Sequence, residues 1–126
     1  MKNLDLGTLK RAIEGNDADR LMSLFAENAS LRVIDSIHPP SHPLDLNGRA
    51  QIAEFYDDVC GRGITHHLKD VASGDGHLAF TEECEYPNGT KVFCSAMLDI
   101  DDDGHISREV MVQAWDSDEQ RVTPMD

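Results

Sequence analysis

Three long alternating segments in the last third of the chain constrain its fold more than any other feature. They are predicted as strands at His77–Tyr86, Lys91–Ile100 and Ile106–Trp115, with turns at Asn88-Gly89 and Asp103-Gly104. Asn-Gly is the strongest short-range hairpin signal, because a two-residue type I′ turn needs positive φ at both central residues. Strands usually have about five or six residues. We therefore expect a long antiparallel meander that curves around an interior.

The spacing of apolar residues upstream predicts three helices. They span Leu4–Glu14, Ala18–Ala26 and Arg49–Cys60. Gly15-Asn16 is expected to close the first helix as a left-handed cap, and Asp17 and Asn47 stand at the N-cap positions of the second and third. All predicted helices thus precede the meander.

Two further strands are predicted at Ser30–Ile34 and Ile64–Val71, and Leu44–Leu46 is a candidate edge strand. Asp35–Pro43 has three prolines in five positions, which predicts a stiff extended loop. This order predicts an α+β fold, in which three N-terminal helices pack on a strongly curved, mainly antiparallel sheet. Such a sheet forms a cone with an internal pocket. We expect one domain, residues 1–126.

The composition narrows the possible partners. A formal charge of −13 disfavours nucleic acid and anionic membranes, because phosphate contacts need Lys or Arg. No apolar segment reaches the roughly 18 residues of a membrane span, and the first residues lack the apolar core of a signal peptide. Cys60, Cys84 and Cys94 are an odd number without metal-ligand spacing. We therefore expect a reduced, cytoplasmic protein without a cofactor.

Three segments carry a family pattern, namely Ala12–Ala29, Leu46–Ile52 and Gly104–Ile106. Together they resemble the nuclear transport factor 2-like superfamily, specifically its SnoaL-like branch. The resemblance implies a cone-shaped α+β barrel over nearly the whole chain, and homodimers that pair through the outer sheet face. It says little about function, since the superfamily includes ketosteroid isomerases, polyketide cyclases, epoxide hydrolases, dehydratases and non-catalytic binding modules.

Steroid isomerisation can be tested against this resemblance. A gapless overlay puts the general base, the tyrosine and the protonated aspartate of that reaction on Val33, Leu9 and Ala96. None of these side chains can do the chemistry. Asp35 lies two residues from the base position, but the oxyanion donors are missing, so steroid isomerisation is rejected.

The other catalytic branches fit to different degrees. An epoxide hydrolase of this family needs an Asp-Arg-Asp set that holds a water, and Arg108 and Asp99 lack a third member. A cyclase needs an Asp/His acid–base pair in the cone. The cyclase branch is therefore the least excluded on chemical grounds.

The register of the meander decides which side chains face the pocket. A two-residue turn at Asn88-Gly89 predicts the facing pairs Cys84–Phe93, Glu82–Ser95 and Phe80–Met97, and the next hairpin pairs Ile100 with His105. Cys84 and Cys94 then lie on opposite faces, so no disulfide joins them. The family overlay puts Glu109, Met111, Gln113 and Trp115 inside, whereas a bulge in the first strand would turn Glu82 and Cys84 inside.

Adjacent polar residues must point to opposite faces of a strand. One of Glu82 and Glu83 is therefore expected to be buried, either as a general acid or base or as a salt-bridged glutamate. One ring of His66-His67 must likewise point inward, as a site residue or a structural histidine. Gln113 and Trp115 either bind a ligand or form ordinary core and rim.

The proline-braced loop is expected to rim the mouth of the cone. Its Asp35 and His38 are candidates for proton transfer. With His42 they also form a possible metal-ligand set, although the spacing outside a helix is not diagnostic. A plain surface loop is the alternative.

Two functional hypotheses remain. The first is a SnoaL-like enzyme that performs acid–base chemistry on a small apolar, oxygenated substrate, with catalytic candidates Asp35, His38 and Glu82. Ligand-binding candidates are His42, Tyr56, His66, Cys84, Glu109, Met111, Gln113 and Trp115. The second is a non-catalytic binding module, whose carboxylates pair with Arg32 or Arg108 and whose pocket is filled by side chains. Both predict a homodimer through the sheet face, since neither face of the sheet is cleanly polar.

Overall fold

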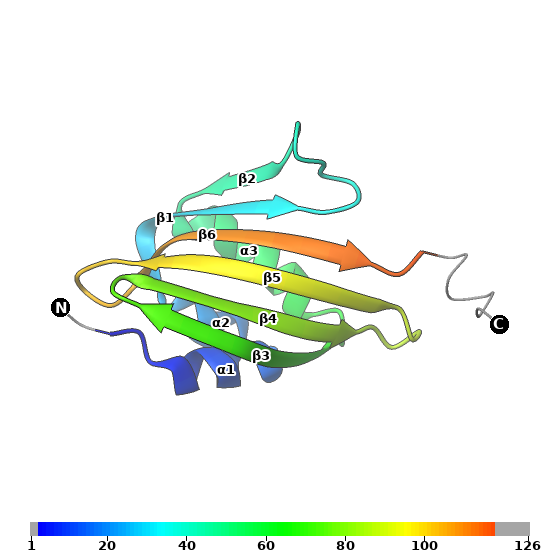
Figure 1. The fold of residues 1–126 in the computed structure, drawn as a ribbon, viewed down its shortest axis with the longest axis horizontal. Coiled ribbons are helices and arrows are strands. Elements are labelled where there is room, and N and C mark those ends of the chain that lie inside the picture. The colour runs from blue at the N-terminus through cyan, green and yellow to red at the C-terminus, as the bar shows by residue number, and fades with distance from the viewer. Residues whose placement is uncertain (1–2, 118–126) are drawn as a thin grey trace.

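The computed structural model describes residues 3–117 of the chain. Three helices lie on one face of a single curved sheet of six strands (Figure 1). The elements are α1 Leu6–Glu14, α2 Ala18–Met22, β1 Phe25–Ile34, β2 Leu44–Asn47, α3 Arg49–Cys60, β3 Thr65–Gly74, β4 His77–Glu85, β5 Lys91–Ile100 and β6 Ile106–Trp115. The predicted α+β class is confirmed.

The strand order in the sheet is β2-β1-β6-β5-β4-β3. β1 runs parallel to β6, and every other neighbouring pair is antiparallel, so the last four strands form the predicted meander. The sheet curves into a cone and stays open between its edge strands β2 and β3 (Figure 1). Because β1 and β6 are parallel, the loop that follows β1 lies at the same end of the sheet as the last residues of β6.

The second helix is shorter than predicted, because the residues assigned to its end belong to the sheet. α2 stops at Met22, and β1 begins at Phe25 instead of Ser30. The backbone N–H of Ile106 donates to the carbonyl of Leu24 at 2.8 Å, and Phe25 pairs with Ile106 in β6. Phe25 is fully buried, so strand pairing and burial override its helical spacing.

The helix caps confirm two predictions and correct one. The Asp17 carboxylate accepts the backbone N–H of Arg20 at 3.0 Å, as an N-cap should. After α1 the left-handed residue is Asn16, with φ of 52°, whereas Gly15 has φ of −90°. The N-cap of α3 is Gly48 with φ of 92°, because Asn47 is held in β2 by its pairing with Ser30.

The β4–β5 turn has three residues, and the predicted type I′ turn is wrong. The N–H of Gly89 donates to the carbonyl of Tyr86, and the N–H of Tyr86 donates to the carbonyl of Thr90. Proline at position 87 sets φ near −65°, which favours a type I turn, and Gly89 supplies the following left-handed residue with φ of 88°. A three-residue loop shifts the register by one.

This shift corrects the predicted facing pairs. Cys84 lies opposite Val92, Glu82 opposite Cys94 and Phe80 opposite Ala96, and not opposite Phe93, Ser95 and Met97. A shift of one residue turns a strand over relative to its neighbour. Cys84 and Cys94 therefore share a face, contrary to the prediction, although both are free thiols.

The β5–β6 register also differs from the prediction. Ile100 pairs with Ile106 and not with His105, and an irregularity precedes this pair. The Asp101 carboxylate accepts the N–H groups of Asp103 and His105, both at 3.0 Å, which widens the turn. Leu98 consequently lies opposite Glu109, two residues beyond the predicted position 107, and an even shift preserves the face.

Burial alternates along the meander as a result. The inward residues of β4 to β6 are buried: Leu78, Phe80, Glu82, Cys84, Val92, Cys94, Ala96, Leu98, Ile106, Glu109 and Met111. They pack against Leu9 of α1 and Ile52 of α3 in one core. The outward residues Phe93, Met97 and Val112 are 47%, 65% and 47% exposed. The sequence left two alternatives for the residues that line the pocket, one with Glu82 and Cys84 and one with Glu109 and Met111. In the structure both of these pairs face the same interior.

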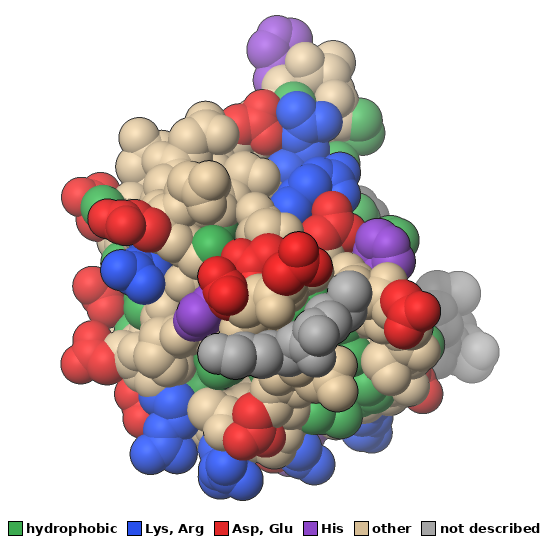
Figure 2. All heavy atoms as spheres, turned by 90° about the vertical axis from the view of Figure 1, so that its left-hand side faces the viewer, with side chains coloured by type: hydrophobic (Ala, Val, Ile, Leu, Met, Phe, Trp, Pro, Cys, Tyr) green, Lys and Arg blue, Asp and Glu red, His purple; other side chains and the backbone are tan. Residues whose placement is uncertain are grey.

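The surface agrees with the acidic composition. Figure 2 shows the end of the molecule that lies on the left in Figure 1, and acidic side chains gather near its centre. None of the helices in residues 3–117 is long and apolar enough to cross a membrane.

Candidate functional site

A cavity of about 460 Å³ lies between the inner sheet face and the helices. Its apolar lining includes Leu9, Ile13, Phe55, Val59, Phe80 and Met111. Polar side chains enter it as three separate groups, on α3 and β6, on the loop after β1, and on β3 and β4. An apolar cavity with a few converging polar groups is the usual form of a small-molecule site.

The first group joins Tyr56 to Glu109. Tyr56 follows buried Ile52 by one helical turn on the inner face of α3, and Glu109 precedes Met111 on the inner face of β6. The Tyr56 hydroxyl donates to Glu109 Oε1 at 3.0 Å, and both side chains are buried. This contact connects the helical layer to the sheet inside the cavity.

Burial determines the charge state of this pair. It raises the pKa of Glu109 to about 8, although the hydrogen bond from Tyr56 opposes the shift and the charge of Glu82 adds to it. Burial and the nearby carboxylates also hold the pKa of Tyr56 well above 10. Glu109 is therefore largely protonated at neutral pH.

The second group is the Asp35–His38 pair at the start of the proline loop. Asp35 Oδ1 accepts the ring Nδ1–H of His38 at 3.0 Å and the backbone N–H groups of His38 at 2.8 Å and Ile37 at 3.0 Å. Both side chains line the cavity. The carboxylate thus fixes the orientation of the ring, and Nε2 is the ring nitrogen that does not bond to Asp35.

The rest of the proline loop does not join the site. His42 is exposed, bonds to the Ser41 hydroxyl, and does not converge with Asp35 and His38. The backbone N–H of His42 donates to the carbonyl of Pro39, so a turn lies between the two histidines. The metal-ligand set Asp35, His38 and His42 is therefore not assembled.

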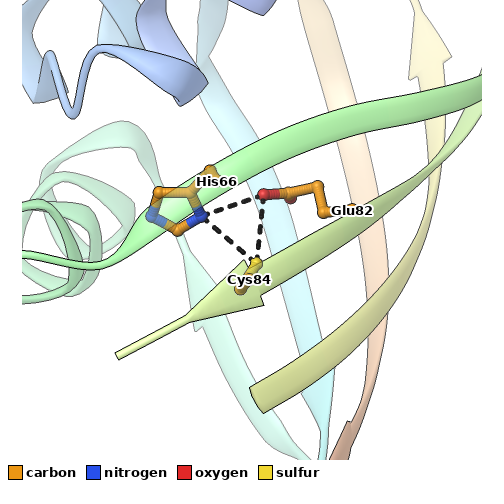
Figure 3. Close-up of side chains that lie close together, drawn as sticks. All are labelled: His66, Glu82 and Cys84. Atoms are coloured by element: carbon orange, nitrogen blue, oxygen red, sulfur yellow. Dashed lines mark hydrogen bonds and ion pairs between the residues drawn. The ribbon is translucent and has the colours of Figure 1, made fainter. Parts of the chain in front are cut away.

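The third group is the His66–Glu82–Cys84 cluster (Figure 3). His66 Nδ1 lies 3.1 Å from Glu82 Oε1 and 3.3 Å from Cys84 Sγ, and the carboxylate and sulfur are 3.7 Å apart. His66 and Cys84 are directly paired on β3 and β4, and Glu82 is two residues along β4 on the same face. In the pair Glu82-Glu83 the first residue is buried and the second is exposed. The same holds for the pair His66-His67.

The cluster polarises its own thiol. Hydrogen bonds with Cys94 and then His66 lower the pKa of Cys84 to about 6 against the effect of burial. Burial lowers the pKa of His66, but hydrogen bonds with Cys84 and Glu82 outweigh it and raise that pKa to about 9. The thiol of Cys94 has its pKa raised by the bond to Cys84 and by burial. Cys94 was not a site candidate in the sequence, because the wrong turn type placed it on the other face.

The rim of the cavity is aromatic. The Trp115 indole N–H donates to Gln113 Oε1 at 3.0 Å, and its ring lies 5.3 Å from that of Tyr86. Arg62 donates to the Tyr86 hydroxyl at 2.8 Å and pairs with Asp58. Trp115 is 36% exposed, so it lies at the mouth and not in the interior.

Comparison with known proteins identifies the fold. A family model described as "SnoaL-like domain" matches residues 8–109. No curated protein matches the sequence. An NTF-2 like protein of unknown function from Burkholderia xenovorans superposes with a TM-score of 0.73 at 12% identity, over 96% of this chain and 90% of the other.

Two further structures are similar. An NTF2-like protein of unknown function from Mesorhizobium loti gives a TM-score of 0.72 at 14% identity, over 84% of each chain. The epoxide hydrolase/cyclase-like enzyme SalBIII, described in pyran ring formation in the polyether salinomycin, gives 0.68 at 19% identity, over 86% of this chain and 87% of its own. At these identities the likeness concerns the fold alone.

Proposed function

The chain belongs to the family of SnoaL-like domains, and on that premise we propose that it is an enzyme performing acid–base chemistry on a small, apolar, oxygenated molecule. The reaction is an isomerisation, cyclisation or dehydration in the cone cavity. Glu109 is the general acid, Tyr56 positions it, and the Asp35–His38 pair is the general base. The single observation that carries this proposal is the buried, uncompensated carboxyl of Glu109.

A buried glutamate needs a reason, because burial of a carboxyl costs stability unless it is paired. Glu109 accepts a hydrogen bond from Tyr56, which is neutral, so it takes the protonated form. A protonated carboxyl in a dry site can donate to a carbonyl or leaving hydroxyl of a substrate and take the proton back. The apolar lining suits the rest of such a molecule.

The base is supported by geometry at the mouth. Asp35 orients the His38 ring through Nδ1, which leaves Nε2 to accept a proton from a carbon acid or hydroxyl. An acid and a base held on different elements let one substrate lose and gain protons at different atoms. Isomerisation and cyclisation both involve the loss of a proton at one atom of the substrate and the gain of a proton at another.

The binding-module hypothesis predicted carboxylates neutralised by arginine and a filled pocket. Arg32 instead pairs with Asp45 at 2.7 Å, and Arg108 with Asp99 at 3.6 Å, all on exposed surface. The cavity keeps its volume of about 460 Å³ with Phe55 and Met111 in its wall. These contacts favour the enzyme over the module. The surface pairing of Arg108 with Asp99 also gives no support to the Asp-Arg-Asp set that an epoxide hydrolase of this family needs to hold a water.

We also propose that the protein is a homodimer through the outer sheet face. Phe93, Met97 and Val112 form an exposed apolar group on neighbouring strands β5 and β6. A second copy would bury it symmetrically. The dimer is independent of the catalytic proposal.

The test uses solvent deuterium. The purified protein is screened by native mass spectrometry for bound small ketones, enones and hydroxyketones, and each binder is incubated in deuterated buffer. We expect deuterium incorporation or loss of water with wild-type protein and at least about a hundredfold slower reaction with Glu109→Gln or His38→Asn. Glu83→Gln, on the exposed face, is the matched control. Binding without any proton exchange above the Glu109→Gln rate would contradict the enzyme and support the module.

A further inference from the structure

We propose that the His66–Glu82–Cys84 cluster is a zinc-binding site that opens on the cavity. This inference stands apart from the acid–base proposal, since it uses none of Tyr56, Glu109, Asp35 and His38. Figure 3 shows the imidazole, carboxylate and thiol converging on one point from β3 and β4. The described residues hold one group of three such ligands with all donor atoms within 4.8 Å of one another, and it is this group.

The spacing of the donor atoms fits a tetrahedral ion. Zinc bonds of about 2.0–2.3 Å to nitrogen, oxygen and sulfur place neighbouring donors of a tetrahedron about 3.3–3.6 Å apart. The three observed separations are 3.1, 3.3 and 3.7 Å.

A hydrogen-bond network explains this arrangement less well. Glu82 and Cys84 both approach the same ring nitrogen, His66 Nδ1. In a catalytic triad the nucleophile and the carboxylate use opposite ring nitrogens, so that one proton can be relayed. Here two acidic groups compete for one N–H. A divalent cation would satisfy all three donors together.

Burial adds to the argument. The side chains of His66 and Glu82 are 9% and 7% exposed, and Cys84 is 7% exposed. In this interior Glu82 contacts His66, which pairs with it when protonated, and the thiol of Cys84. One imidazole can compensate only one of the two acidic groups, and a second buried acidic group costs stability unless it too has a positive partner. A metal ion supplies that charge.

The ligand types select the metal. Thiolate and imidazole favour zinc over magnesium or calcium, which prefer oxygen ligands. Three protein ligands with a fourth position toward a cavity are the pattern of catalytic zinc sites, and structural sites have four. Cys94 pairs with Glu82 across β4 and β5 on the same sheet face as Cys84, which places it as an outer partner of the site. A bound oxygenated molecule in the cavity could take the open position.

The experiment titrates the chelator-treated full-length protein with Zn²⁺ and, separately, with Co²⁺, which reports thiolate ligation by a sulfur-to-cobalt charge-transfer band. We expect one equivalent of zinc and a clear band. Cys84→Ser should abolish the band, and Cys94→Ser should weaken zinc binding by about 10–100-fold. Cys60→Ser, on α3, is the matched control and should keep both.

Folding is checked separately, because a core variant can fail for other reasons. Each variant is melted by circular dichroism, and Cys84 alkylation is followed in the wild-type protein with and without zinc. Zinc should slow alkylation of Cys84 strongly and leave that of Cys60 unchanged. No stoichiometric zinc at micromolar concentration, or a cobalt band that survives in folded Cys84→Ser, would overturn the proposal. Glu109→Gln should bind zinc normally, so the two proposals can fail independently.

Discussion

The hydroxyl of Tyr56 on α3 donates a 3.0 Å hydrogen bond to the carboxyl of Glu109 on β6, and both side chains are buried in the cone. The two residues are 53 positions apart in the chain. Burial raises the pKa of Glu109 to about 8 even though this hydrogen bond opposes the shift, so packing keeps a carboxylic acid in the cavity. The charge state of this acid therefore depends on packing between a helix and a strand that are distant in the sequence.

Stability should fall with rising pH because of Glu109. Its pKa is about 8 in the folded protein and 4.5 in the reference state, so the unfolded chain loses this proton first. The contribution of protonated Glu109 to the free energy of unfolding is fully present below about pH 4.5 and is lost as the pH rises toward 8. Glu109→Gln keeps an acceptor for Tyr56 and removes the titration. In urea unfolding, the stability of this variant relative to the wild type should rise with pH, by about 4 kcal/mol at pH 8.

The control for this experiment is Glu83→Gln, an exposed glutamate of the same sheet. Its difference from the wild type should stay nearly constant across the same pH range. A Glu109→Gln difference that is equally flat would mean that Glu109 is ionised when folded.

The hydroxyl of Tyr56 should contribute to stability through its hydrogen bond to Glu109. Tyr56→Phe removes the donor from a buried carboxyl and should cost about 1 kcal/mol of unfolding free energy. In a Glu109→Ala background, which removes the acceptor, the cost of Tyr56→Phe should fall, and a double-mutant cycle measures the coupling of the two side chains. Zero coupling would show that the contact contributes nothing.

The outer sheet face should control association. Met97 is 65% exposed and lies opposite Ala79 and Val110 on the neighbouring strands. Met97→Glu puts a charge in the centre of the proposed interface and should dissociate the dimer without unfolding it. Sedimentation velocity at micromolar concentration measures this. A wild-type protein that sediments only as a monomer would rule out the dimer.

The β4–β5 turn should depend on Gly89. Its φ is 88°, and a Cβ added at this position would meet nothing within 4 Å, so Gly89→Ala has a backbone cost alone. We expect a loss of about 1 kcal/mol in chemical denaturation. Gly74→Ala is the matched control, because its surroundings are equally open and its φ is not positive. Equal effects of the two substitutions would contradict the three-residue turn.

Local signals in the sequence predicted local structure well. The bounds of α3, β5 and β6 agree with the prediction, and Asp17 caps α2. The Asp35–His38 pair also follows from the chain itself, because the two residues are three apart in a tight turn. Hydrophobic periodicity, helix caps and short turns depend on residues that are close together in the chain. They can therefore be predicted from the sequence without knowledge of the fold.

The contents of the cavity required the tertiary structure. Alternation tells which residues of one strand share a face, but the turn decides how that face aligns with the next strand. Proline at position 87 made a three-residue loop, and this brought Glu82 and Cys84 to the side of Cys94 and Glu109. The sequence by itself determined the cone, its helices and its meander. Only the packing of α3 and β3 against that meander decided that Tyr56 meets Glu109 and that His66 meets Glu82 and Cys84, because such contacts depend on burial between distant segments and not on local pattern.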